Sequence, residues 1–284
     1  MNTKTSQFIG INLLLLCSIL VISFLGIILW DILIKGSPAL STEFISEYPQ
    51  NGMTEGGIFP AIMGTVWVTL VTALFAIPLG IACAIYLSEY AEDNWVSRSI
   101  RASIRNLAGV PSIIYGLFGV AIFVQGMGMG TSILASGFTL GLLTLPYIIT
   151  TTEEALKTVP QSHREGAFAL GATHWETVRS VVLPSAIPGM MTGAILGLSR
   201  AAGETAPILF TGVAFYLRYL PAGVFDEFMA LPYHLYILST QHHAIEQVRP
   251  LAYGTALVLI GLVCILNIVA FVIRHRYRSL LKGH

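Results

Sequence analysis

The sequence predicts an all-α membrane protein with six transmembrane helices, forming one transmembrane domain over residues 1–284. Hydrophobic residues make up 55% of the chain, and charged residues make up only 11%, against about 25% in an ordinary soluble protein. The mean hydropathy is +0.75. This composition excludes a soluble enzyme, a disordered chain and a secreted disulfide scaffold. The formal net charge of zero gives no electrostatic reason to expect nucleic acid as a partner.

Uncharged apolar runs predict where the chain crosses the bilayer, because a crossing helix needs about 20 mainly apolar residues. We expect spans at about 8–33, 61–87, 107–124, 131–152, 186–211 and 251–273. The third and fourth spans come from one uncharged run that is too long for a single crossing. Gly126, Gly128 and Gly130 lie in its middle and predict a break, because glycine is a weak helix former. The first run is too long for the apolar region of a signal peptide, and no A-x-A-like cleavage site follows it, so we expect it to be retained.

Lysine and arginine predict the orientation of the chain. Six crossings leave both termini on one side, and the segments on that side hold eleven basic residues: Lys4, Arg98, Arg101, Arg105, Lys157, Arg164, Arg179, Arg274, Arg276, Arg278 and Lys282. The segments on the other side hold three: Lys35, Arg218 and Arg249. Cytoplasmic loops carry the excess of basic residues. We therefore expect cytoplasmic termini, a cytoplasmic loop at about 153–185 and an outer loop at about 212–250.

The cytoplasmic loop at 153–185 contains the first candidate functional segment. Phe168, Trp175 and Val178 recur at helical spacing, which predicts a short amphipathic helix from Ser162 to about Ser180. Such a helix can dock into a groove of a partner protein, or it can lie on the lipid surface. The periodicity favours neither interpretation over the other.

Six residues of this loop have the spacing of a known motif: Glu165, Ala167, Gly171, Val181, Leu183 and Pro184. In this respect the chain resembles the ABC-importer permeases, whose EAA motif has this pattern. The sequence departs mildly at Gly166, where the family more often has alanine, and at Val181, where it often has isoleucine. The resemblance implies the type I ABC importer permease fold and a coupling helix that sits in a cleft of an ATPase subunit. It assigns ATPase coupling to Glu165, Gly166, Ala167, Gly171, Leu183 and Pro184.

The second candidate segment is inside the fifth expected span, where Arg200 and Glu204 are four residues apart and would share one face of a helix. An ionisable residue at the bilayer centre costs about 2.5–3.5 kcal/mol, so it normally faces the bundle interior or a water-filled path. Arginine stays charged, and its planar fork of donors suits phosphate or carboxylate oxygens. Glu204 can pair with Arg200 when no anion is bound. The alternative is a buried ion pair that only fixes helix packing.

The segment Arg200-Ala201-Ala202-Gly203-Glu204-Thr205 resembles the phosphate-importer permeases, in which a similar stretch marks the same span. The resemblance implies a phosphate pathway that includes Arg200, Glu204 and Thr205. Three alternatives stay open at this point. The chain could serve another oxyanion such as sulfate or molybdate, it could be an ion-coupled phosphate transporter with Glu204 as a proton carrier, or it could be a membrane anchor or sensor without transport.

The sequence contains no G-x-x-x-x-G-K-[ST] loop, and none of its four lysines follows a glycine. We therefore expect a transport subunit that is not itself an enzyme and binds no cofactor, with ATP and Mg²⁺ in a partner ATPase. The resemblance implies a bacterial plasma (inner) membrane protein whose partners are a second permease subunit, two ATPase subunits, an extracytoplasmic phosphate-binding protein and membrane lipids.

Other chemistry-bearing residues give no site. His234, His242 and His243 share the outer loop without the spacing or companion ligands of a metal centre, so we expect none. Glu153 and Glu154 are interpreted as solvated charges at a helix end. The three cysteines lie in apolar stretches and predict no disulfide.

Overall fold

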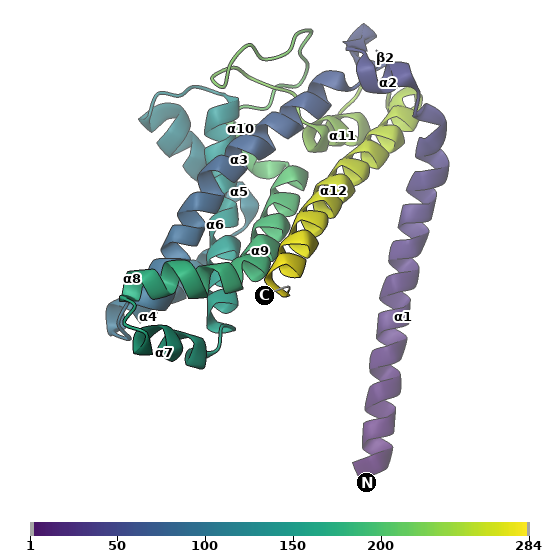
Figure 1. Cartoon of the computed structure of the whole chain (residues 1–284). Helices are drawn as coiled ribbons and strands as arrows, with labels where there is room; N and C mark the ends of the chain where they lie inside the picture. The colour runs from purple at the N-terminus through teal and green to yellow at the C-terminus, as the bar shows by residue number, and fades with distance from the viewer. Residues whose placement is uncertain (1–2, 283–284) are drawn as a thin grey trace.

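The protein is a bundle of helices with one short two-stranded hairpin, described here by a computed structural model (Figure 1). The structure describes residues 3–282, so residues 1–2 and 283–284 of the expected domain lie outside the described part. The first half of the chain forms α1 (Thr3–Gly36), η1 (Ser37–Ala39), α2 (Thr42–Ser46), β1 (Pro49–Gln50), η2 (Asn51–Met53), β2 (Glu55–Gly56), α3 (Phe59–Ile85), η3 (Tyr86–Tyr90), α4 (Trp95–Leu107), α5 (Ser112–Gly119) and η4 (Val120–Gly126). The second half forms α6 (Ile133–Lys157), α7 (Gln161–Ala169), α8 (His174–Thr177), η5 (Val178–Val182), α9 (Leu183–Gly203), α10 (Ala206–Thr211), α11 (Leu231–Thr240) and α12 (Ile245–Lys282).

Five helical segments of the described chain are long and apolar enough to cross a membrane: Gly10–Ala39, Phe59–Tyr90, Ile133–Lys157, His174–Gly203 and Ile245–Arg276. A sixth candidate is the pair Trp95–Leu107 and Ser112–Gly126, whose two parts meet at 105°. The count reaches the expected six if this bent pair makes one crossing. In Figure 1, α1 stands apart from the other helices along most of its length, and only the C-terminal end of α1 approaches α12.

The third span differs from the expected 107–124. The helix breaks after α4, and the apolar part restarts at Ser112 and continues through the π-helical turn η4 to Gly126. Pro111 explains the break, since a proline disfavours helical geometry in the residue before it. At the other end, Gly128 and Gly130 adopt a φ of +65° and separate η4 from α6. The chain therefore turns at the glycines that interrupt the long apolar run.

The fifth span is also broken, where the sequence suggested one helix over 186–211. The helix begins early, since α8, η5 and α9 run on from His174 to Gly203. It stops at Glu204, whose backbone is extended (φ −76°, ψ 137°), and α10 follows with Pro207 in its first turn. The expectation that Arg200 and Glu204 share one helix face is therefore wrong. Arg200 lies in the last turn of α9, and Glu204 is the residue that ends it.

The loop expected on the cytoplasmic side forms two helices rather than the single one expected over 162–180. The first is α7, and it ends at a turn where Gly171 has a φ of +87°. The next helix then starts at His174, behind a capping box formed by Thr173 and Glu176. A left-handed glycine followed by a strong N-terminal cap is a typical way to end one helix and start another.

The last span and the loop expected on the outer side, residues 212–250, are more helical than expected. α12 begins at Ile245 and extends beyond the expected 251–273 at both ends. Within the outer loop, α11 buries Leu231, Ile237 and Leu238 completely or almost completely. The aromatic-rich outer segment is therefore partly packed into the fold.

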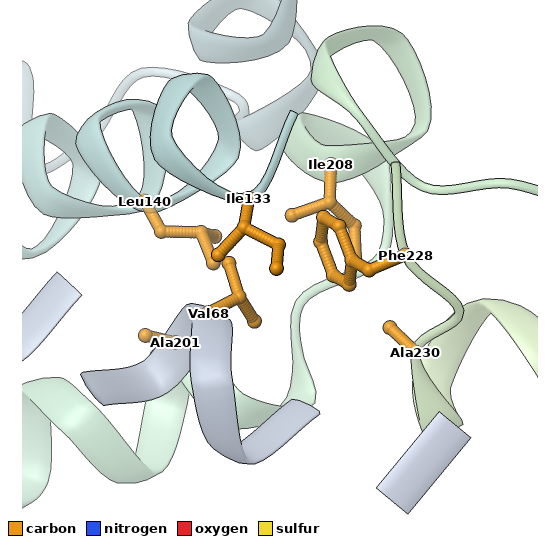
Figure 2. Close-up of a cluster of buried hydrophobic side chains, with 7 residues drawn as sticks. All are labelled: Val68, Ile133, Leu140, Ala201, Ile208, Phe228 and Ala230. Atoms are coloured by element: carbon orange, nitrogen blue, oxygen red, sulfur yellow. The ribbon is translucent and has the colours of Figure 1, made fainter. Parts of the chain in front are cut away.

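The core that positions the candidate site joins four helices and the outer segment (Figure 2). Its buried members are Val68 of α3, Ile133 and Leu140 of α6, Ala201 of α9, Ile208 of α10, and Phe228 and Ala230 of the outer segment. α3 and α6 approach closely, since a β-carbon at Gly137 or Gly141 would overlap Val71 or Phe75. The break between α9 and α10 is thus fixed from both sides by packed apolar residues.

Candidate functional site

Arg200 is placed by the end of α9. The helix terminates at Gly203, so its last carbonyl groups and the negative end of its dipole lie near the guanidinium. The Arg200 side chain is 40% exposed in this chain, and that of Glu204 is 17% exposed. An arginine at this position is stabilised by the helix end, and it remains accessible.

Arg200 is held by two side chains. Its Nε donates a hydrogen bond to Oε1 of Glu204 at 3.3 Å. Its Nη1 donates to the hydroxyl of Tyr147, a residue of α6. The guanidinium carbon also lies 4.6 Å from the centre of the Tyr147 ring, within the range of a cation–π interaction. The expected pair Arg200–Glu204 is therefore present, and its third member, Tyr147, was not predicted from the sequence.

The Arg200 pair faces an open groove. Ser199, Arg200, Gly203 and Glu204 form one wall, and Leu259, Ile260, Val263 and Cys264 of α12 form the other. The groove volume is about 530 Å³, large enough for a hydrated tetrahedral oxyanion. Thr205, the remaining expected pathway residue, is half-buried at the N-terminus of α10, next to the groove.

A second polar contact between spans lies one residue earlier. Ser199 donates a hydrogen bond to Oδ1 of Asn267 at 2.6 Å, which ties α9 to α12 beside the groove. Hydrogen bonds between spans have no competition from water in the lipid core and help to fix helix packing. Asn267 was not among the expected site residues, although a polar side chain in an apolar run is a detectable signal.

The residues of the EAA-like pattern are distributed over α7, the turn that follows it, η5 (which contains Val181) and the start of α9. Glu165, Gly166 and Ala167 lie on α7, none of whose residues is buried. Gly171 lies in the following turn, with open space around its Cα, and Leu170 beside it is 90% exposed. The last two residues, 183 and 184, begin α9 and are half-buried. The pattern therefore describes an exposed helix, a turn and the foot of a span, not one continuous surface helix.

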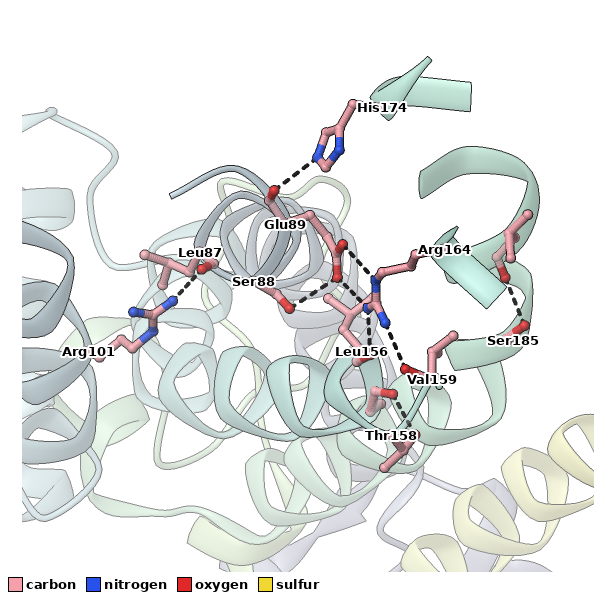
Figure 3. A network of polar contacts seen from close by, with 12 residues as sticks. Leu87, Ser88, Glu89, Arg101, Leu156, Thr158, Val159, Arg164, His174 and Ser185 are labelled. Carbon is pink, nitrogen blue, oxygen red and sulfur yellow. Dashed lines mark hydrogen bonds and ion pairs between the residues drawn. The ribbon is translucent and has the colours of Figure 1, made fainter. Parts of the chain in front are cut away.

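An ion pair that the sequence did not reveal anchors α7 to the spans (Figure 3). Arg164 of α7 donates to Oε1 of Glu89 at 2.9 Å through Nη2 and to Oε2 at 3.3 Å through Nε. The two side chains are only 14% and 5% exposed. Arg164 also donates to the carbonyls of Leu156 at 3.1 Å and Val159 at 2.7 Å, at the end of α6. One arginine thus joins α7 to η3 and to α6.

A second ion pair lies beside the first and corrects an expectation. Arg101 of α4 donates to Oε1 of Glu153 at 2.9 Å and to the carbonyl of Leu87 in η3. Glu153 is buried, so it is not a solvated helix-end charge, whereas Glu154 is exposed as expected. Because Leu87 and Glu89 belong to the same turn, both arginines hold η3 (Figure 3).

The histidines of the segment 212–250 lie in and after α11. Within residues 3–282, no group of three or more His, Cys, Asp or Glu is arranged to hold a metal ion. His234 of α11 is buried, and its Nδ1 has no hydrogen-bond partner. Burial, with a smaller contribution from His242, lowers the pKa of His234 to about 4. His234 is therefore a neutral core residue.

Comparisons with known proteins agree with this architecture. The family described as binding-protein-dependent transport system inner membrane component matches residues 76–279. The chain is 32% identical over 281 residues to the probable ABC transporter permease protein YqgI of Bacillus subtilis, with 95% of each chain covered. It is 36% identical over 222 residues to the phosphate transport system permease protein PstA 1 of Mycobacterium tuberculosis, covering 77% of this chain and 71% of that protein.

The fold also matches a solved structure. A bacterial ABC transporter involved in the import of the acidic polysaccharide alginate superposes with a TM-score of 0.67 over 96% of both chains, at 12% identity. At this identity the likeness concerns the fold alone, and it confirms the expected all-α permease fold of ABC importers. The family match covers most of the chain and the relatives cover still more. The chain therefore belongs to the family of inner membrane components of binding-protein-dependent transport systems.

Proposed function

We propose that this chain is one of the two permease subunits of an ATP-driven phosphate importer. The observation that carries the proposal is a permanently charged fork, Arg200, held by Glu204 and Tyr147 at a break in a membrane span and open to a groove. A planar guanidinium suits the oxygens of phosphate. The similarity to PstA 1, which is named a phosphate transport system permease, supports phosphate among the oxyanions.

Transport would use Arg200 as a transient contact. An incoming anion gains charge-assisted hydrogen bonds from the guanidinium, and Glu204 competes for the same donors. Because a carboxylate 3.3 Å from Arg200 also repels a bound anion, it keeps the anion from being held tightly. A weak, exchangeable site is what a pathway requires, since a tight site would stop release to the cytoplasm.

Energy would enter through α7. This exposed helix, with Glu165, Gly166 and Ala167, is proposed to sit in the cleft of an ATPase subunit that holds ATP and Mg²⁺. The Arg164–Glu89 pair and the two α6 carbonyls give its motion a connection to the spans. In this proposal both termini and α7 are cytoplasmic. The complex comprises this chain, a second permease, two ATPases and an extracytoplasmic phosphate-binding protein.

The proposal is tested in proteoliposomes that contain the complete complex and its binding protein. Arg200→Gln should abolish uptake of radiolabelled phosphate while the ATPase and the second permease still co-purify. Arg200→Lys, which keeps the charge but loses the fork, serves as the matched control and should retain a small fraction of uptake. Normal uptake by Arg200→Gln would refute the pathway role. Import of sulfate or molybdate in place of phosphate would refute the substrate assignment.

A further inference from the structure

The bend between α4 and α5 exposes backbone carbonyls that two tyrosines satisfy. The end of a helix leaves its last carbonyls without helical donors. At this bend, Tyr115 donates from its hydroxyl to the carbonyl of Leu107 at 2.8 Å, and Tyr147 donates to the carbonyl of Ala108 at 3.3 Å. The two phenols come from different helices, α5 and α6. Only Tyr147 of this pair also contacts Arg200.

The Tyr147 hydroxyl therefore has two simultaneous partners. A phenol has one proton to donate and lone pairs that accept. It accepts from Nη1 of Arg200 while its own proton goes to Ala108, which gives a continuous chain from the guanidinium to the bend. A cationic donor polarises such a chain and strengthens the next hydrogen bond along it.

Two of the three nitrogens of Arg200 already donate to a side chain, so a bidentate anion competes with one of these partners at either fork. A guanidinium offers two forks to a bidentate anion, one formed by Nε with one terminal nitrogen and one formed by the two terminal nitrogens. Glu204 occupies Nε and Tyr147 occupies Nη1, so each fork is partly blocked. Displacing the neutral phenol leaves the Arg200–Glu204 ion pair intact, whereas displacing Glu204 places two anions against each other. A bidentate anion therefore displaces Tyr147 more readily than Glu204.

We infer that Tyr147 is a positioning residue that transmits occupancy of Arg200 to the α4–α5 bend and so to the coupling region. This inference rests on the proposed function. α4 continues from the bend to Arg101, which holds Glu153 and the carbonyl of Leu87. The turn that contains Leu87 also contains Glu89, the partner of Arg164 on α7. The contacts are physically contiguous from the groove to the exposed helix.

The test measures phosphate imported per ATP hydrolysed, in proteoliposomes with the complete complex. Tyr147→Phe removes both hydrogen bonds and keeps the ring over Arg200, while Tyr147→Leu removes the ring as well. Tyr115→Phe is the matched control, because it removes a phenol whose hydrogen bond goes to the same bend and not to Arg200. The loss of a hydrogen-bonded link corresponds to a change of about fivefold. We expect the ratio to fall by about that factor in Tyr147→Phe, to fall further in Tyr147→Leu, and to stay near wild type in Tyr115→Phe.

Each other outcome overturns the inference. If Tyr147→Phe imports as much phosphate per ATP as the wild type, Tyr147 does not transmit occupancy of Arg200. If Tyr115→Phe lowers the ratio equally, Tyr147 only caps the carbonyls of the bend. Loss of the ATPase from purified Tyr147→Phe complexes would likewise assign a purely structural role. A wild-type complex that imports no phosphate overturns the proposed function together with this inference. Phosphate import with an unchanged ratio in Tyr147→Phe overturns only the inference.

Discussion

The Arg164–Glu89 contact gives the sharpest test of how α7 is joined to the membrane spans. Replacing Glu89 with glutamine removes the charge opposite a guanidinium that is only 14% exposed. Removing one partner of a buried pair costs about 3–5 kcal/mol. Glutamine still accepts one hydrogen bond, and Arg164 keeps two backbone carbonyls, at 3.1 and 2.7 Å. We therefore expect a smaller cost, about 2 kcal/mol, in the free energy that holds α7 against the spans.

A cost of 2 kcal/mol corresponds to about a 30-fold change in the equilibrium between held and released α7. The direct assay is amide hydrogen exchange in residues 161–170 of the purified complex, which should accelerate by that factor in Glu89→Gln. Exchange in α3, well inside the bundle, provides the internal reference and should stay unchanged. Uptake should fall while the complex still assembles.

Exchanging the two charged residues tests whether Arg164 and Glu89 act only as an ion pair, or whether Arg164 also needs its hydrogen bonds to the two α6 carbonyls. In the double variant Glu89→Arg with Arg164→Glu, the two opposite charges face each other again. The new glutamate would meet the carbonyls of Leu156 and Val159, where the arginine previously donated. We expect the double variant to stay defective, because a carboxylate cannot donate to a carbonyl. Full recovery of slow exchange and of uptake would refute the reasoning.

Three further predictions follow from single positions. Gly171→Ala should weaken binding of the ATPase and destabilise the turn by about 1–2 kcal/mol, since a φ of +87° disfavours a side chain. Gly166→Ala introduces the residue that the ABC-importer permeases more often have at this position of the proposed interface, and it has open space for a methyl group, so it should not weaken ATPase binding; pull-down with the ATPase compares the two. Burial lowers the pKa of His234 from 6.5 to about 4, so folding keeps its imidazole neutral. The stability that this provides is fully present above pH 6.5 and is lost as the pH falls towards 4, and the total loss is about 3 kcal/mol. Melting curves from pH 7.5 to 5 should show this loss, and His234→Gln should flatten it; a parallel decline in both proteins would contradict it. Gly137→Leu should separate α3 from α6 and lower the melting temperature, because its side chain would overlap Val71; an unchanged melting temperature would exclude close packing there.

Local patterns predicted the helices and the charged groove pair. Apolar runs placed the spans because lipid requires them, and the costly charges of Arg200 and Glu204 marked a site because few other ionisable residues lie inside a span. The pair was nevertheless expected on one helix face, whereas the helix ends between the two residues. The spacing of four residues could not show this, since it fits both a helix and a helix end.

The partners of the charged residues could not be predicted in the same way. Tyr147 is 53 positions from Arg200, and Glu89 is 75 positions from Arg164. Nothing local in the sequence distinguishes Tyr147 from other tyrosines of the spans. Similarly, Glu153 and Glu154 are equivalent as letters, and only the packing of α4 against α6 makes the first a buried partner and leaves the second in solvent.

Two contacts join the α4 region to α6, and the distance between them along the chain is similar on both sides. Tyr147 meets Ala108 at one end, and Glu153 meets Arg101 at the other. Seven residues separate the contacts on α4 and six on α6, or about 10 and 9 Å along each helix at 1.5 Å per residue. Because the spacings agree, both contacts can form without distorting either helix, and α4 moves with α6 while both are made. Release of Tyr147 by an anion leaves the Arg101–Glu153 pair joining α4 to α6, while Tyr115 still links α5 to the end of α4. The bend then swings about the end nearest the proposed coupling region.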